Sequence, residues 1–241
     1  MITVISKHLP LITNGLVPRD VVLRNIHYVE TIRYNITALN TLKEREIEVP
    51  SGFNPGIAVR KEELGHLYRF MVIWFSIEGV VRTSRSFLDH FWRTVAANSP
   101  ELSAIKEVRN EKYMSKALSY LRNNEHGAKE SPTYLMLESE WSAWGRYVVD
   151  FRNYLDYREP LGGMLSSSIG QIVQRGESVD IIIPDRFPGH EERKKPFEFA
   201  YRRNLTVSTF FDGMLQRIDI MVPSVINEMH TRILSHIHVR T

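Results

Sequence analysis

The 241-residue sequence contains no cysteine. Disulfide scaffolds, thiolate zinc sites and cysteine nucleophiles are therefore excluded. The most apolar stretch, Met71–Ile77, lies between Arg69 and Glu78 and is far shorter than the roughly 20 residues that span a bilayer. The first residues lack the charged start and long apolar core of a signal peptide. We therefore expect a cytoplasmic protein with no membrane partner.

A strong excess of one charge is also missing, since 31 basic and 28 acidic side chains give a net charge of +3. Proteins dedicated to duplex nucleic acid carry a denser basic face, whereas a local basic patch over an RNA site needs no large net charge. The sequence has no Gly-rich Walker phosphate loop, no HExxH and no GxSxG. Nucleotide, zinc-protease and serine-hydrolase sites of those kinds are therefore not predicted.

The sequence has the composition of a folded globular chain, with 43% hydrophobic and 24% charged residues. Its length fits one domain spanning residues 1–241. Apolar residues recur at steps of three and four, which predicts α-helices between loops rich in proline and glycine. The predicted helices cover Val21–Lys43, Lys61–Ala97, a short helix that starts at Ser99-Pro100-Glu101, Glu111–Glu125, Ser131–Tyr157 and Phe197–Ser235.

Three details of these helices are expected from single residues. Gly79 is the expected place of a kink in the second long helix. Pro223 is expected to kink the last helix or split it in two. The inward positions of the 131–157 helix are expected to be Leu135, Trp141, Trp144, Val148, Phe151 and Leu155.

One segment has a different period. Residues 169–185 alternate apolar and polar side chains around Gly176 and then run through Ile181–Ile183. A period of two with a central glycine predicts a β-hairpin, whose apolar run needs cover. The sequence thus predicts a mainly α fold, a bundle of about five or six helices with one β-hairpin insertion at about 169–185.

An Arg-Asn pair lies within the helix predicted over 131–157, in the segment FRNYLDYREP, Phe151–Pro160. This segment resembles the Arg-x4–6-His motif of the HEPN superfamily, which is helical and rich in toxin and antiviral-defence ribonucleases. Arg152-Asn153 and the spacing match the family motif, and Tyr157 stands where the family has histidine. The resemblance covers that segment, and the helical pattern around it is compatible.

The resemblance implies a metal-independent endoribonuclease without a cofactor. In the family's reaction the ribose 2′-OH attacks the adjacent phosphate; Arg152 would stabilise the phosphate charge and residue 157 would handle protons. Histidine, with a pKa of about 6.5, suits that task, whereas tyrosine, at about 10, is a poor general base. Tyr157 can still hydrogen-bond a phosphate, so an active and a catalytically decayed protein both stay open. The implied partners are RNA and a second copy of the chain, in a homodimer with Arg152 near the two-fold axis.

A second candidate site consists of Arg122 and His126 in the segment LRNNEHG. Their spacing is one residue short of the family motif, but it places both side chains on one face of a helix. The alternative interpretation is a helix C-terminus, where the helix dipole favours basic groups. His90 with Asp89 forms a further candidate, and so do the C-terminal histidines with Glu228. These last are His230, His236 and His238, for which a solvated tail is the alternative to a metal site.

A non-catalytic interpretation stays open beside the ribonuclease. Arg152 needs no catalytic role on a helix surface. Four tryptophans lie on apolar stripes, which is typical of core residues rather than of a platform for stacking bases. They are Trp74, Trp92, Trp141 and Trp144. The alternative function is therefore a helical binding or regulatory protein with a protein partner, and a metal enzyme built on scattered histidines and carboxylates is the third hypothesis.

Overall fold

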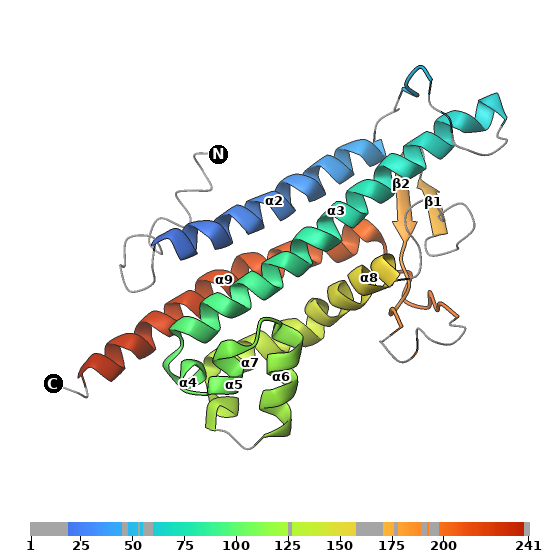
Figure 1. The fold of residues 1–241 in the computed structure, drawn as a ribbon. Coiled ribbons are helices and arrows are strands. Elements are labelled where there is room, and N and C mark those ends of the chain that lie inside the picture. The colour runs from blue at the N-terminus through green and yellow to red at the C-terminus, as the bar shows by residue number, and fades with distance from the viewer. Residues whose placement is uncertain are drawn as a thin grey trace. The chain divides into compact units, whose positions relative to one another are not determined.

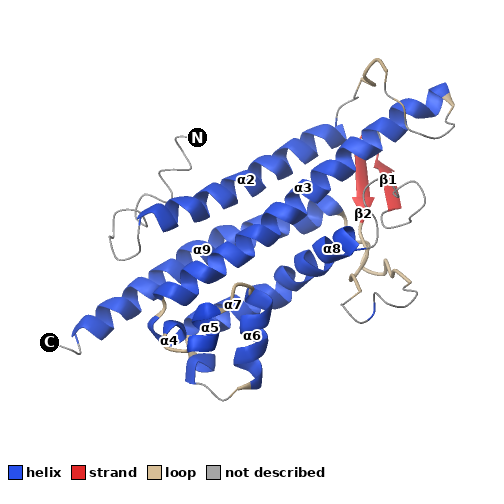
Figure 2. Cartoon of the chain, in the orientation of Figure 1, coloured by secondary structure: helices blue, strands red, loops and turns tan. Residues whose placement is uncertain are grey.

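The chain is mainly α-helical in the computed structural model, which describes residues 19–44, 48–52, 54, 60–124, 127–157, 171–175, 178–188, 192 and 198–238. Helices dominate the cartoon in Figure 2, and the one sheet formed by these residues is a two-stranded antiparallel pair. The predicted fold class, a mainly α protein with one β-hairpin insertion, is confirmed.

The described segments form eight α-helices and two strands, which Figure 1 labels along the chain. The helices are α2 (Arg19–Glu44), α3 (Lys61–Asn98), α4 (Pro100–Ser103), α5 (Lys106–Asn110), α6 (Met114–Asn123), α7 (Pro132–Glu140), α8 (Arg146–Tyr157) and α9 (Val207–His238). The strands are β1 (Gln171–Arg175) and β2 (Ser178–Ile182). A 3₁₀ turn at Gly127–Glu130 precedes α7, and a π-helical turn at Trp141–Gly145 joins α7 to α8.

The two longest N-terminal helices follow the predicted apolar pattern. Helix α2 buries Val22, Asn25, Val29, Ile32, Ile36 and Leu39, which recur every three or four residues. Helix α3 continues through Gly79 without a break in its helical assignment. The bounds of both helices differ from the predicted ones by no more than two residues at either end.

The helix predicted over residues 131–157 begins where the sequence indicated. The Ser131 hydroxyl accepts a hydrogen bond from the backbone N–H of Tyr134 at 3.1 Å, and Pro132 occupies the first turn. Such a cap satisfies an amide that the helix itself leaves unpaired. In the π-helical turn, a Cβ on Gly145 would lie 3.1 Å from the Trp141 ring, so this position favours glycine.

The prediction that Leu135 points inward is wrong, because its side chain is 54% exposed. Leu137 is fully buried instead. Leu137 lies four residues before Trp141, on the same helical face, whereas Leu135 lies six residues before it and faces another direction. The other predicted inward residues are buried, namely Trp141, Trp144, Val148, Phe151 and Leu155.

The helix predicted over Glu111–Glu125 is shorter than expected at both ends. Helix α6 begins at Met114, whose backbone N–H donates to Asp89 at 3.3 Å. It ends at Asn123, because Asn124 has an extended backbone with φ −117° and ψ 143°. The prediction of a helix through residue 125 is therefore wrong.

The predicted hairpin is confirmed, with β1 and β2 in register from Gln171–Ile182 to Arg175–Ser178. The last helix, however, begins at Val207 rather than Phe197. The residues before it pair with the end of β2, since Ile183 N–H donates to the carbonyl of Leu205 at 2.8 Å. These backbone bonds compete with helix formation. Helix α9 then continues through Pro223 in one piece.

The described residues cluster into two compact units. Unit 1 contains residues 19–31, 83–148 and 214–238, and unit 2 contains residues 32–82, 149–157, 171–188, 192 and 198–213, within the described segments. The division falls inside α2, α3, α8 and α9. The prediction of one domain over residues 1–241 stays a prediction.

Unit 1 is a helical bundle whose members are linked by polar contacts. The Asn25 amide of α2 donates to the Thr94 hydroxyl of α3 at 3.1 Å in the buried interior. Arg217 of α9 pairs with Glu140 of α7 at 2.9 Å. Large aromatic side chains fill the core of this unit, including Phe87, Phe91, Trp92 and Trp144, as predicted for the tryptophans.

Unit 2 is held by an aromatic cluster between α3, α8 and the segment after β2. Phe151 stacks on Phe187 with ring centroids 4.2 Å apart, and its ring lies 6.2 Å from Trp74. Tyr154 and Phe199 add edge contacts to the same cluster. Ile181 and Ile183 are fully buried, so the apolar run of the hairpin has the cover that it needs.

Helix α3 is the most apolar of the described helices. Its residues Glu63–Asn98 include an 18-residue window of mean hydropathy 1.2, so by length and composition α3 is capable of crossing a membrane. Core helices of soluble proteins pass the same test, and α3 has a fully buried face that includes Ile77, Val80 and Val81. The expectation of no membrane partner stays a prediction.

Lys43 supplies a testable polar link in unit 2. Its ammonium donates to Asp180 of β2 at 3.2 Å and to Ser208 of α9, with the Lys43 and Asp180 side chains only 8% and 16% exposed. We expect Lys43→Met to lower the free energy of unfolding by about 3 kcal/mol, because Asp180 is left buried without its counter-charge. Urea unfolding measures the change. The double variant Lys43→Met/Asp180→Leu should recover most of the loss, and a single variant as stable as the wild type would contradict this role.

Candidate functional site

The Arg-Asn pair lies near the C-terminal end of α8, in unit 2. Phe151 and Leu155 turn one face of this helix into the core, which leaves Arg152 at the surface with its side chain 36% exposed. Arg152 Nη1 lies 2.5 Å from a carboxylate oxygen of Asp156 and 3.4 Å from the Asn153 side-chain oxygen. Asp156, four residues after the arginine, lies on the same helical face.

A second arginine reaches the same carboxylate from α3. Arg82 Nη1 lies 2.9 Å from Asp156 Oδ1, while Arg152 contacts Oδ2. Arg82 is also held by Glu78, one turn earlier on α3, at 2.5 and 2.6 Å. Partial burial acts to lower the pKa of Arg82, but the hydrogen bonds and charges of Glu78 and Asp156 outweigh it and raise that pKa above its usual value. We call Arg82, Arg152 and Asp156 the arginine–carboxylate cluster.

The structure therefore adds Arg82 and Asp156 to the site predicted from the sequence. Arg82 and Arg152 lie far apart in the chain, and no spacing rule connects them. The local sequence feature near Arg82 is Glu78, four residues earlier. Such a spacing predicts an ion pair on a charged helical face but does not predict a site. Tyr157 is the last residue of α8, and its side chain lies outside the described residues.

The competing site loses the geometry on which its prediction depended. Arg122 lies in the last turn of α6, and the helix ends before His126. The continuous helix that this prediction assumed ends at Asn123, and His126 itself lies outside the described residues. The Arg122 guanidinium instead pairs with Glu138 of α7 at 2.9 Å. This pair links α6 and α7 on an exposed surface.

Asp89 and His90 have structural partners in unit 1. Asp89 accepts hydrogen bonds from Arg85 at 2.6 Å and from the N–H of Met114 at the start of α6. Burial raises the pKa of Asp89, although Arg85 acts to lower it. The His90 ring lies 5.2 Å from the Tyr28 ring, and burial together with the charges of Arg93 and Arg24 lowers its pKa. The hydrogen bond from Met114 to Asp89 fixes where α6 begins.

His230 is buried in unit 1, and neither ring nitrogen has a hydrogen-bond partner among the described residues. Glu228, two residues earlier, pairs with Arg232 at 2.7 Å rather than with the histidine. The side chains of His236 and His238 lie outside the described residues. Within the part of the chain that the structure describes, no three histidines or carboxylates gather as a metal site would require.

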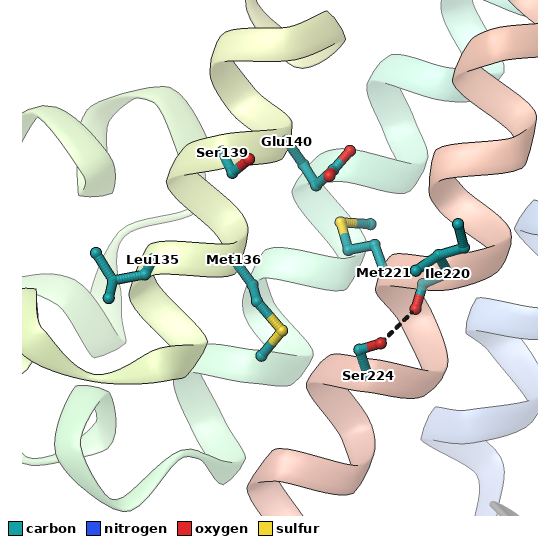
Figure 3. A pocket seen from close by; sticks show the side chains of 7 residues that line it. All are labelled: Leu135, Met136, Ser139, Glu140, Ile220, Met221 and Ser224. Atoms are coloured by element: carbon teal, nitrogen blue, oxygen red, sulfur yellow. Dashed lines mark hydrogen bonds between the residues drawn. The ribbon is translucent and has the colours of Figure 1, made fainter.

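An apolar groove lies between α7 and α9 in unit 1 (Figure 3). It encloses about 310 Å³ and is lined by Leu135, Met136, Ser139, Glu140, Ile220, Met221 and Ser224. The Ser224 hydroxyl donates to the Ile220 carbonyl, so its proton is already engaged. The Glu140 carboxylate accepts hydrogen bonds from Arg217 and from the Trp144 indole N–H, both at 2.9 Å. The groove therefore offers an apolar floor and no unpaired charge from its carboxylate.

Comparisons of the chain with models of known families, with curated proteins and with solved structures find no match. The HEPN resemblance therefore depends on Arg152-Asn153, on the spacing to Tyr157 and on the helical fold. It stays a prediction.

His230 predicts a pH dependence of stability. Burial lowers the pKa of the folded histidine, so the unfolded chain binds more protons at pH values from about 6.5 down to the folded pKa. The free energy of unfolding should fall as the pH falls through that window, by at most about 1.4 kcal/mol per pH unit from this group. Urea unfolding at pH 7.5 and 5.5 should show a smaller loss for His230→Leu than for the wild type. His27→Gln, at an exposed position on α2, is the control; an unchanged loss in His230→Leu would contradict the assignment.

Proposed function

We propose that this protein is a HEPN-like RNA-binding protein of the toxin or antiviral-defence kind, with ribonuclease activity weakened or lost at Tyr157. The single observation that supports the proposal is the meeting of two guanidinium groups, from Arg82 and Arg152, at one carboxylate. Paired guanidinium donors match the oxygens of a phosphate better than any other side-chain group does. The predicted phosphate-binding residue thus has a second arginine beside it.

The roles of the residues follow from this chemistry. Arg152 and Arg82 would hold the non-bridging oxygens of a backbone phosphate, and Asn153 would position the chain beside it. Tyr157 would hydrogen-bond the phosphate or donate a proton, but its phenol, with a pKa of about 10 in water, is a poor base near neutral pH. Binding without efficient cleavage is the result. A homodimer with Arg152 near its two-fold axis would place two such sites together, as the resemblance implies.

Binding is tested with a fluorescein-labelled single-stranded RNA by fluorescence anisotropy. We expect Arg152→Ala to weaken binding by about 10- to 100-fold, because a charge-assisted hydrogen bond to phosphate is worth roughly 1.5–3 kcal/mol. Arg82→Ala should have a smaller effect in the same direction, and Arg122→Ala is the matched control. Loss of binding in Arg122→Ala with full binding in Arg152→Ala would reject the site.

Cleavage is tested on the same RNA with EDTA present. Any activity should persist, since no metal takes part in the family's reaction, and should require the 2′-OH. Arg152→Ala should raise the barrier by roughly 3–4 kcal/mol through lost charge stabilisation. Tyr157→His should raise the rate above wild type, and Tyr157→Phe tests whether the phenol handles a proton. Activity that EDTA abolishes would contradict the ribonuclease part of the proposal.

The groove of unit 1 supports an alternative to the homodimer about Arg152, in which a second copy of the chain binds at the groove instead. Leu135 and Ile220 are 54% and 69% exposed and flank a hollow lined by Met136 and Met221. Each copy therefore presents both protruding apolar side chains and an apolar hollow. A two-fold interface uses the same surface of both copies, so such a surface has to be complementary to itself. Flexible methionine side chains adapt readily to an inserted residue. The ion pair of Glu140 with Arg217 also supplies charges of both signs beside the hollow.

Light scattering after size-exclusion chromatography tests this surface. Ile220→Asp should shift the chain from dimer to monomer at micromolar concentration, because a buried carboxylate without a partner is costly. Leu23→Asp is the control, since Leu23 is an exposed leucine of the same unit away from the groove. A wild type that is monomeric, or an Ile220→Asp variant that stays dimeric, would remove the groove as a self-association surface.

A further inference from the structure

We infer that Asp156 occupies the phosphate position of the arginine–carboxylate cluster, and that an RNA phosphate binds there by replacing it. The inference rests on the proposed function and adds its regulation. Asp156 would act as a built-in competitor that sets how tightly RNA binds.

The geometry of the cluster supports an exchange of one anion for another. The two oxygens of Asp156 are divided between two guanidinium groups, with Oδ1 facing Arg82 at 2.9 Å and Oδ2 facing Arg152 at 2.5 Å. The two non-bridging oxygens of a phosphodiester present the same pattern of acceptors. Among the described residues, the two arginines are the hydrogen-bond and ion-pair partners of the Asp156 carboxylate.

The charge balance also favours a phosphate that replaces Asp156 over a phosphate that binds beside it. Arg82 and Arg152 carry two positive charges, and Glu78 and Asp156 carry two negative ones. A phosphodiester that bound with Asp156 still in place would meet four groups whose charges cancel. A phosphodiester that replaced it would restore the same balance, while Glu78 would keep Arg82 oriented.

Asp156 contributes little to the stability of its own helix. It lies in the last turn of α8, at the end where the helix dipole disfavours a carboxylate. The pair also runs from arginine to aspartate along the helix, the less favourable order for an ion pair four residues apart. The side chains of Arg82, Arg152 and Asp156 are 46%, 36% and 21% exposed, so solvent reaches the cluster. Partly exposed ion pairs of this kind contribute modestly to stability.

The test is Asp156→Asn, which removes the charge and keeps the shape. With a fluorescein-labelled single-stranded RNA, we expect the variant to bind about 5-fold more tightly than the wild type, since an exposed ion pair is worth up to a factor of about five. The control is Glu192→Gln, which removes a carboxylate paired with Arg186 in the same unit. It should leave the RNA affinity within about two-fold of the wild type, because this exposed ion pair lies outside the cluster. The gain should vanish in Asp156→Asn/Arg152→Ala. Asp156→Ala should show the same gain and guards against a local defect of the asparagine variant.

The outcomes separate the inference from the proposed function. If Arg152→Ala loses RNA binding and both Asp156 variants bind as the wild type does, the inference is overturned and the proposed function stands. If the Asp156 variants gain affinity equally for single-stranded DNA and RNA while the wild type binds neither, the anion exchange is supported and the RNA-binding function fails. An equal gain in Glu192→Gln would show a general charge effect and overturn the inference.

Discussion

The burial of Phe151 determines which face of α8 is exposed, and that face carries Arg152 and Asp156 of the arginine–carboxylate cluster. Its ring is fully buried, stacked on Phe187 and near Trp74, so the C-terminal part of α8 has little rotational freedom within unit 2. Positions 152 and 156 must then lie together on the outer side of the helix. The aromatic core of unit 2 therefore places Arg152 and Asp156, and α3 supplies Arg82 from the helix that packs Trp74 against Phe151.

Electrostatics gives this surface its chemical character. Two guanidinium groups, balanced by Asp156 and Glu78, form a site that is neutral when empty and matched to an oxyanion when the Asp156 carboxylate moves away. Under the proposed function, the positive charge concentrated at Arg82 and Arg152 and masked by Asp156 would give a chain with a net charge of only +3 a local site for RNA.

Local patterns in the sequence predicted most of the helices and the hairpin. The Ser131-Pro132 start, the apolar stripe of α2 and the alternation around Gly176 depend on neighbouring residues, and the structure bears out the elements that they predict. Features that depend on distant residues were missed. Helix α9 begins late because the residues before it pair with the end of β2, and α6 begins at Met114 beside Asp89 of α3.

The residues of the candidate site were likewise predicted where they depend on a local motif and missed where they depend on helix packing. Arg152-Asn153 was found from a local motif, whereas the pairing of Arg82 with Asp156 depends on how α3 and α8 pack, which no spacing in the sequence records. Arg122 and His126 were grouped on the assumption of a continuous helix, and Asn124 ends that helix through its extended backbone.

The most direct measurement of the central claim is the response of individual arginine side chains to RNA. In ¹⁵N NMR spectra, the Nε–H signals of Arg82 and Arg152 are assigned from Arg→Lys variants and followed during titration with a short single-stranded RNA. We expect both signals to shift together with one saturation curve, while that of Arg122 stays in place, because both guanidinium groups exchange Asp156 for the same phosphate. A shift of Arg122 alone, or saturable RNA binding with both cluster signals unmoved, would contradict the proposed site.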